Sequence, residues 1–183
     1  RKRIEKEQAR LVAIIEATSD FVGTADLEGR PLFINRAGPQ MLGFESEQDM
    51  STVRIGESHP EWAAKLVLET GIPHAIEHGT WSGETAFLHR DGHEIPVSQV
   101  IIAHGGGDGP VEYLSTIARD ITLQKEHEKR ITRLNRVYAV LSGINTTIVR
   151  TRDRREMFEE ACRIAIEQGK FRLAWIGLVE ANG

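Results

Sequence analysis

Apolar and polar positions follow two spacings along this chain, and each spacing predicts a different kind of element. In residues 1–18 the apolar residues recur at helical spacing among charged ones, which indicates an amphipathic helix. From residue 21 onward, short apolar runs bounded by turn residues indicate β-strands. The predicted strands are 21–26, 30–35, 80–89, 94–104 and 111–120.

Turn residues predict how these strands are connected. Glu28-Gly29 and Asp91-Gly92 each join two strands into a hairpin, because glycine accepts the left-handed backbone that such turns need. Antiparallel hairpins with short helices gathered between the second and third strands indicate an α+β domain with a five-stranded antiparallel sheet. The predicted connections are a helix at 37–42 ended by Gly43, a capping box at 46–49, a helix at 61–69 stopped by Gly71, a helix at 72–78 with Pro73 in its first turn, and a glycine-rich loop at 105–110.

Beyond residue 122 the pattern changes to one long helix. Apolar residues alternate there at spacings of three and four, which is a heptad seam with the polar Asn145 at an a position. Asp153 is the expected N-cap of a further helix, and Phe171–Val179 is predicted to be one buried strand. The predicted organisation is a linker helix at 1–18, a domain at 19–122, a signalling helix at 123–150 and the start of another domain at 151–183. The seam consists of Ile131, Leu134, Tyr138, Leu141, Asn145 and Ile148.

The charge and cysteine content limit the partners and the cellular location that we expect for this chain. The 183 residues carry a net charge of −4 without an unbalanced basic stripe, so we do not expect nucleic acid as a partner. A single cysteine, Cys162, suits a reducing compartment, so a cytoplasmic location is expected. No apolar run approaches the roughly 20 residues of a membrane span, so no membrane contact is expected within this stretch, although a parent protein can be anchored elsewhere.

Seven short motifs occur in order across residues 11–122. They are Ser19-Asp20, Asp26-Leu-Glu-Gly29, Phe33-Ile-Asn35-Arg-Ala37, Leu42-Gly43-Phe44, Trp81-Ser-Gly83-Glu84, Arg90-Asp91-Gly92 and Arg119-Asp120-Ile121-Thr122. Together with the order of two strands, several short helices and three strands, they resemble the PAS family of sensor domains.

The resemblance implies a small-molecule ligand or cofactor between the sheet and the helix that precedes the third strand. Haem would take its axial ligand from that helix, where His74 or His78 lies. A non-covalent flavin would be lined by Trp81 and Asn35. The simpler interpretation places His78 at a helix C-terminus, Trp81 in the core and Asn35 on the backbone of the strand-to-helix turn.

Other chemistry finds less support in the residues. His74 and His78 lack a third metal ligand beside them, and His89 and His93 are expected to be exposed hairpin residues, so we predict no metal site. No nucleophile motif or carboxylate pair stands out, so no catalytic residues are assigned and this stretch is not expected to be an enzyme.

Signal transmission is expected at the Asp120-Ile121-Thr122 motif, where Asp120 holds the end of the last strand and Thr122 caps the exit helix. That helix is expected to form a homodimer in which Asn145 fixes the register. Residues 131–179 resemble the opening of a GAF domain. The resemblance implies a parent protein that makes or degrades cyclic di-GMP, with a histidine kinase sensor or a ligand-free dimerisation module as alternatives.

Overall fold

The computed structural model describes residues 2–46, 50–105 and 109–178. It separates the chain into two units, residues 1–123 and 124–183. The predicted capping box at 46–49 and the predicted loop at 105–110 both include residues outside the described ranges, so both stay predictions.

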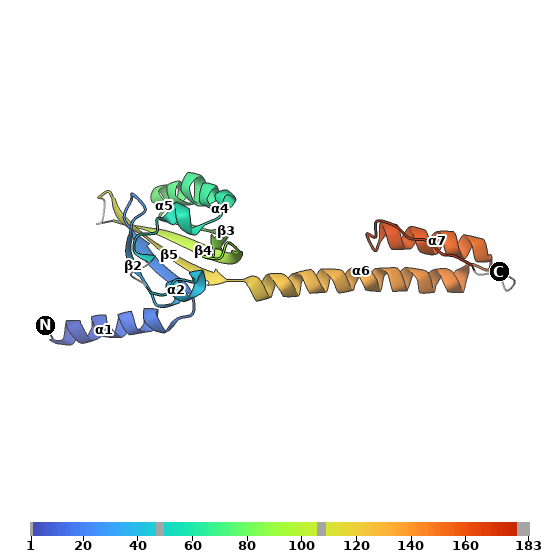
Figure 1. The fold of residues 1–183 in the computed structure, drawn as a ribbon, viewed down its shortest axis with the longest axis horizontal. Helices are drawn as coiled ribbons and strands as arrows, with labels where there is room; N and C mark the ends of the chain where they lie inside the picture. The colour runs from blue at the N-terminus through green and yellow to red at the C-terminus, as the bar shows by residue number, and fades with distance from the viewer. Residues whose placement is uncertain (1, 47–49, 106–108, 179–183) are drawn as a thin grey trace. The chain divides into compact units, whose positions relative to one another are not determined.

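Five antiparallel strands form one sheet in the order β2-β1-β5-β4-β3 (Figure 1). The first and last strands therefore pair at the centre, where Phe21 lies opposite Ala118 and Ala25 lies opposite Leu114. This confirms the predicted α+β class. The strands are β1 (Phe21–Ala25), β2 (Pro31–Ile34), β3 (Thr80–Leu88), β4 (Glu94–Gly105) and β5 (Val111–Asp120).

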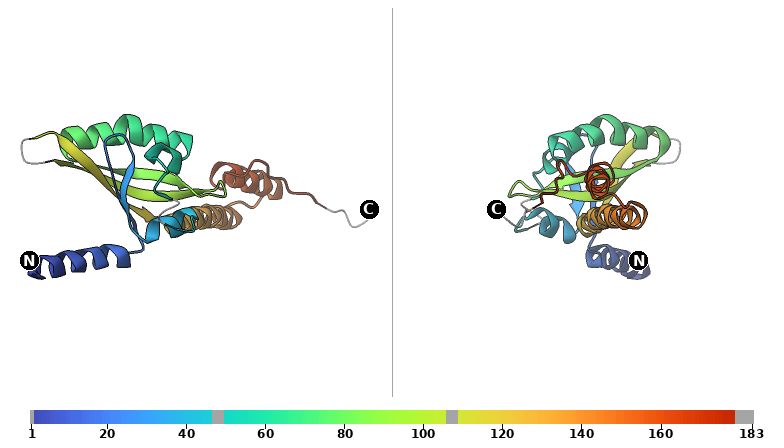
Figure 2. Two further views of the ribbon diagram at one scale, coloured as in Figure 1. Left: turned by 60° about the vertical axis from the view of Figure 1, so that its left-hand side comes forward. Right: turned by 90° about the vertical axis from the view of Figure 1, so that its right-hand side faces the viewer.

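Short helices cover one face of the sheet, and Gly43 and Gly79 end two of them as predicted. Gly43 takes the left-handed αL conformation after α2, with φ 76°, and Gly79 after α5 also has a positive φ, 88°. Figure 2 shows the row formed by α4 and α5 above the sheet. The helical elements whose bounds the structure describes in this unit are α1 (Lys2–Ala17), α2 (Ala37–Leu42), η1 (Ile55–Ser58), α4 (Glu61–Leu66), η2 (Val67–Gly71) and α5 (Ile72–His78).

Gly71 does not end a helix, contrary to the prediction. Its backbone is right-handed helical, with φ −63° and ψ −52°, and α4, η2 and α5 run on without a break. The intervening η2 segment is a π-helix, in which the Ile72 N–H donates to the carbonyl of Val67. Pro73 lacks an N–H, and its ring crowds the carbonyl four residues earlier in an α-helix. The wider π turn gives the ring room, so the chain stays helical through the proline.

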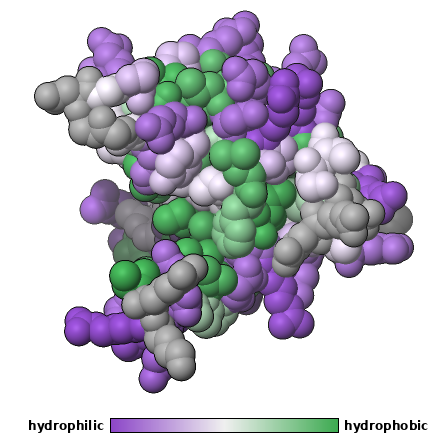
Figure 3. Space-filling view, turned by 90° about the vertical axis from the view of Figure 1, so that its left-hand side faces the viewer, coloured by the Kyte–Doolittle hydropathy of each residue, from purple (hydrophilic) through white to green (hydrophobic). Residues whose placement is uncertain are grey.

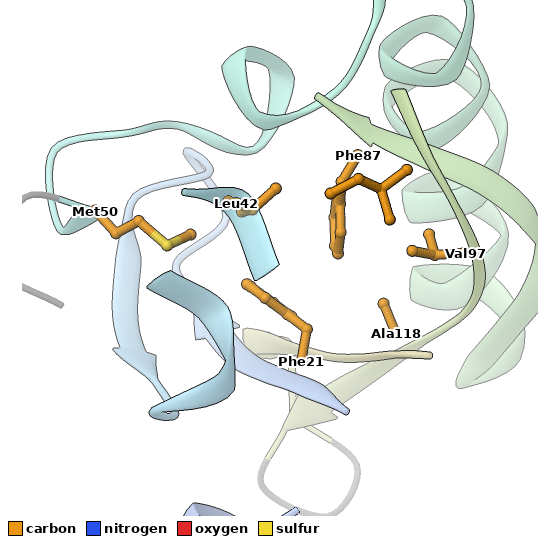
Figure 4. Packing of buried hydrophobic residues seen from close by; sticks show 7 residues of the cluster. Phe21, Leu42, Met50, Phe87, Val97 and Ala118 are labelled. Atoms are coloured by element: carbon orange, nitrogen blue, oxygen red, sulfur yellow. The ribbon is translucent and has the colours of Figure 1, made fainter. Parts of the chain in front are cut away.

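The core lies between the sheet and the helices (Figure 4). Phe21 of β1 and Phe87 of β3 pack with ring centroids 5.0 Å apart. Leu42 of α2 is fully buried beside them, and α2 ends at the next residue, Gly43. A second cluster joins Val67, Ala75 and Ile101 beneath the π segment.

Some apolar residues of the first unit remain at its surface. Figure 3 shows apolar side chains in the middle of one face, bordered by hydrophilic ones. The sheet and its first turn expose Leu27, Leu32 and Ile117, and α1 exposes Leu11 and Ile14. No helix among the described residues is both long enough and apolar enough to span a membrane.

The second unit is helical. It contains most of α6 (Thr122–Arg150) and all of α7 (Arg154–Glu167). As predicted, Asp153 caps α7, because its Oδ1 accepts a hydrogen bond from the Glu156 N–H at 2.8 Å. Ile164 of α7 packs so closely on α6 that a Cβ atom at Gly143 would lie 2.8 Å from its side chain.

The predicted strand at 171–179 is wrong over its described part. Residues 171–178 have no strand conformation, and Leu173 and Trp175 are 75% and 78% exposed. A strand needs a neighbour for its backbone N–H and C=O groups. The described residues after Asp120 contain no other strand, so nothing pairs with this apolar run.

Candidate ligand-binding site

An apolar cavity of about 60 Å³, partly open to solvent, lies between the sheet and the segment that runs from η1 to α5. Strands β1, β2, β4 and β5 all contribute to its walls. Its apolar lining includes Phe21, Phe33, Ile34, Ile55, Val67, Ile72, Ile101 and Leu114, and its polar lining is Thr24, Ser58, Gln99, Ser115 and Thr116.

Gln99 of β4 is the polar centre of this wall. Its side chain is 2% exposed, and its Oε1 accepts a hydrogen bond from the Thr85 hydroxyl at 2.7 Å. Its Nε2 donates to the hydroxyl of Thr116 on β5 at 3.2 Å, and Thr116 donates in turn to the carbonyl of Val100. A buried, hydrogen-bonded chain therefore crosses three strands beside the cavity, so a change at Gln99 reaches β5 directly.

His59 is a buried histidine that the sequence did not single out. Its Nδ1 lies 2.6 Å from the carbonyl of Ile55, so Nδ1 carries the proton and Nε2 is an acceptor. Within the described part of the chain, Nε2 is buried without a hydrogen-bond partner. Burial lowers the pKa of His59 below its usual 6.5, although the Ile55 carbonyl and the Gln99 side chain oppose the shift. The ring is therefore neutral, edge-on to Phe87 with centroids 4.9 Å apart.

His74 and His78 do not reach the cavity. Both are exposed on α5, with their rings stacked at a centroid distance of 4.3 Å. Their Nδ1 atoms lie near the backbone carbonyls of Thr80 and His74, at 3.1 and 3.2 Å. They are paired with each other at the surface, so neither is placed as an inward ligand.

Trp81 and Asn35 are also absent from the cavity wall. Trp81 is partly buried and packs against the second core cluster. Asn35 is fully buried, and its amide is saturated by the backbone: Oδ1 accepts from Val22 N–H at 3.0 Å, and Nδ2 donates to the carbonyls of Ile15 and Asp20 at 3.1 and 2.9 Å. Asn35 thus fastens the end of α1 to the start of β1.

Solved structures resemble this arrangement, whereas no protein-family model and no curated protein matches the chain. The PAS domain of a protein from Colwellia psychrerythraea is 24% identical, with a TM-score of 0.57 over 65% of this chain and 98% of that one. The PAS domain of an HTR-like protein from Haloarcula marismortui is 22% identical, with a TM-score of 0.52 over 66% and 96%. A PAS domain from a two-component sensor histidine kinase is 13% identical, with a TM-score of 0.52 over 63% and 97%.

The chain has the PAS fold. At these identities the similarity establishes the architecture of the sheet and its helices, and the site has to be judged on its own residues.

Haem and flavin do not fit the PAS cavity in this conformation. Pockets that enclose drug-sized ligands measure about 300–1,000 Å³, whereas this cavity measures about 60 Å³. Neither His74 nor His78 lines it, so it lacks the histidine ligand that the sequence suggested for haem. A cavity needs at least about 10–15 Å³ of such space to hold one water molecule, so this cavity suits a ligand of only a few non-hydrogen atoms.

The end of the PAS sheet is held by three local contacts. Asp120 accepts a hydrogen bond from the Thr122 N–H at 2.7 Å, so Asp120 rather than Thr122 caps the start of α6. Ile121 is buried, and its N–H donates to the carbonyl of Pro96 at 2.9 Å. Arg119 donates to both carboxylate oxygens of Asp20, at 2.9 and 3.2 Å, which joins the end of β5 to the start of β1 and raises the pKa of Arg119.

The predicted heptad seam of α6 is exposed. Ile131, Leu134 and Leu141 are 58%, 48% and 52% exposed, and Asn145 lies on the exposed surface too. Helix α7 packs instead on the face of α6 that carries Gly143. The seam therefore remains available within its own unit.

Proposed function

We propose that this chain is the sensory module of a multidomain bacterial signalling protein, in which a small ligand in the PAS cavity alters β5 and thereby the helix that follows it. The ligand has only a few non-hydrogen atoms and a polar group that reaches Gln99. The signal passes through Asp120, Ile121 and Thr122 into α6. No residue of the module is assigned a catalytic role.

The observation that carries this proposal is that β5 both lines the cavity and leads directly into α6. Leu114, Ser115 and Thr116 of β5 line the cavity, and the same strand ends at Asp120, whose carboxylate caps α6. Thr116 is also the hydrogen-bond partner of Gln99. A ligand that competes for the Gln99 amide therefore changes a bond to β5 only a few residues before the output junction.

Hydrogen exchange followed by mass spectrometry tests this coupling in the whole chain. We expect Gln99→Leu to change exchange across 111–130, because it removes the bond to Thr116. Ser98→Ala is the matched control, since Ser98 is exposed on the same strand. In the double variant Gln99→Leu/Asp120→Ala, the change in hydrogen exchange should be confined to residues before 120. If Gln99→Leu alone changes hydrogen exchange in the sheet but not in α6, the proposed route of the signal through Asp120 is refuted.

Native mass spectrometry of freshly purified protein tests the ligand itself. We expect a bound species of low mass that is lost in Gln99→Leu and retained in Ser98→Ala. A haem or flavin mass would contradict the small cavity. An empty protein, together with unchanged exchange in Gln99→Leu, would favour the second candidate function, a ligand-free dimerisation module whose core is filled by side chains.

The output of the module is proposed to be a homodimer formed through the heptad seam of α6. The exposed apolar seam supports this, because apolar side chains at heptad spacing are buried when two helices pair. Sedimentation of the chain over a range of micromolar concentrations should show a dimer, and Asn145→Ile should raise its stability and alter the number of chains. A monomer at high micromolar concentration would contradict the proposal.

For the parent protein we propose a cytoplasmic enzyme that makes or degrades cyclic di-GMP, on the resemblance of residues 131–179 to GAF segments that accompany such domains. A histidine kinase is the alternative. It is favoured by similar folds in a two-component sensor histidine kinase and in a sensor histidine kinase/response regulator from Geobacter sulfurreducens, the latter 20% identical with a TM-score of 0.52 over 64% of this chain and 96% of that one. Assay of the full-length parent for each reaction distinguishes the two.

A further inference from the structure

Two imidazoles and a carboxylate converge at the tip of the β3–β4 hairpin. His89 and His93 each direct Nδ1 at the same oxygen, Oδ1 of Asp91, at 2.9 and 2.5 Å. The two rings are stacked with centroids 4.3 Å apart. One donor atom from each of the three residues lies within 4.8 Å of the other two. The sequence placed these histidines at the surface of a turn, but the fold brings them to a single point.

The three side chains form a ligand set with a definite metal preference. Two imidazole nitrogens and one carboxylate oxygen suit Zn²⁺ and similar transition-metal ions, whereas Mg²⁺ and Ca²⁺ prefer sites built of oxygen alone. A neutral imidazole has one proton, which can move from Nδ1 to Nε2 and leave the Nδ1 lone pair for the metal. An aspartate carboxylate is ionised at neutral pH, so Asp91 offers a negatively charged oxygen to the ion.

The backbone around this cluster is already fixed. His89 N–H donates to the His93 carbonyl at 2.9 Å, and Gly92 closes the turn with φ 95°. Arg90 N–H donates to the carbonyl of Leu42 at 2.9 Å, which ties the hairpin to the end of α2. The ring of His89 is only 24% exposed and rests against Gly43, where a Cβ atom would overlap its Nε2. Little ordering is therefore needed before a metal binds.

The neighbouring charged residues are engaged elsewhere. The Arg90 guanidinium lies over the ring of Phe44, 5.7 Å from its centroid. The Glu94 carboxylate accepts a hydrogen bond from Trp62 at 3.1 Å. The fourth position of a tetrahedral ion is thus left to water, because His93 and Asp91 are more than half exposed.

We propose that His89, Asp91 and His93 form a surface site for one divalent transition-metal ion of the zinc class. The site is separate from the PAS cavity, and it does not depend on the ligand proposed for that cavity. A bound ion links the two ends of the hairpin turn and holds the turn against α2.

The chain supplies a matched control. His74 and His78 form a second stacked pair at the same centroid distance of 4.3 Å, but the nearest carboxylate that the structure pairs with them, that of Glu77, is 3.9 Å from His78 Nδ1. Within the described residues this pair belongs to no group of three such ligands. Two imidazoles without the carboxylate test whether histidine pairs alone account for binding.

Calorimetric titration of the tag-free chain with ZnCl₂ tests the proposal. We expect one ion per chain, with affinity lowered about tenfold or more in Asp91→Asn and lost in His89→Gln/His93→Gln, because even the groups that orient metal ligands contribute about 10- to 100-fold. The variant His74→Gln/His78→Gln should bind as the wild type does. Binding that survives the loss of His89 and His93, or that disappears with His74 and His78, would overturn the assignment, as would a wild-type chain that binds no zinc.

Two further readouts separate metal ligation from a folding defect. Far-ultraviolet circular dichroism of each metal-free variant should match that of the wild type. Zinc should raise the unfolding temperature of the wild type and of His74→Gln/His78→Gln, because a ligand that binds only the folded state stabilises it. It should leave that of His89→Gln/His93→Gln unchanged. Equal shifts in all three proteins would contradict the site, and magnesium at the same concentration should shift none of them.

Discussion

Asn35→Ala is expected to destabilise the first unit strongly, although Asn35 touches no ligand site. The substitution removes three hydrogen bonds, to Val22, Ile15 and Asp20. A typical hydrogen bond contributes about 1 kcal/mol net, and a buried group left without a partner costs about 1–3 kcal/mol. Val22 lies within β1, whereas Ile15 belongs to α1 and is only partly buried, so we expect water to replace the lost bond to its carbonyl. The expected loss is therefore about 3 kcal/mol, or roughly 10–20 °C in Tm.

Urea denaturation followed by tryptophan fluorescence measures this loss in the whole chain. A Trp175→Phe background restricts the fluorescence signal to Trp62 and Trp81, which both lie in the first unit. Because Trp175 is 78% exposed, its replacement should change the stability of the chain little. Asn35→Asp keeps the acceptor for Val22 but sets a carboxylate against two carbonyls, so it should be at least as damaging at neutral pH. Gln40→Ala, at an exposed position of α2, is the control. A loss below about 1 kcal/mol for Asn35→Ala would refute the reasoning.

Two further predictions concern His59 and Gly43. Burial lowers the pKa of His59 in the folded chain below its value in the unfolded chain, so the unfolded chain binds more protons. The free energy of unfolding should therefore fall as the pH drops below about 6.5, and the fall should end once the pH has passed the folded pKa. Urea midpoints between pH 7.5 and 5 should show this fall reduced in His59→Gln, and an unchanged profile would mean that His59 is not the titrating group. Gly43→Ala should cost more than the strain of about 1–2 kcal/mol for a left-handed residue, because its Cβ would overlap His89. Gly92 also has a positive φ, 95°, but a Cβ atom there would meet nothing within 4 Å, so Gly92→Ala should show the backbone strain alone. Equal losses of stability for Gly43→Ala and Gly92→Ala in thermal melts would contradict the clash with His89.

Local chemistry explains the features that the sequence predicted well. Gly43, Asp91-Gly92 and Asp153 act within a few residues of themselves, so their effects can be predicted from the sequence. The Asn35 amide was expected to bond to the backbone of its own turn, but its three partners, Val22, Asp20 and Ile15, lie 13, 15 and 20 residues away. Only the pairing of β1 with its neighbours brings them together.

The features that the sequence did not predict depend on contacts with other parts of the chain. Gly71 was predicted to stop a helix, but the conformation there depends on how Pro73 is accommodated by a π turn. The apolar run after Phe171 was predicted to be a strand, and a strand exists only with a neighbour. The burial of His59 against Phe87 depends on the packing of the sheet, and no local pattern encodes it. The convergence of His89 with His93 follows from the Asp91-Gly92 hairpin, whereas the contact of His89 with Gly43 depends on the position of α2.

The central pairing of β1 with β5 also determines the order in which the chain can fold during synthesis. The two hairpins, β1–β2 and β3–β4, need only local segments and can form as soon as each has left the ribosome. Neither can complete the sheet, because the strand between them is the last to be made. Until residue 120 emerges, the inner edges of β1 and β4 stay open, and such unpaired edges invite association with other chains. The sheet can therefore be completed only once the residue that also caps α6, Asp120, has been made.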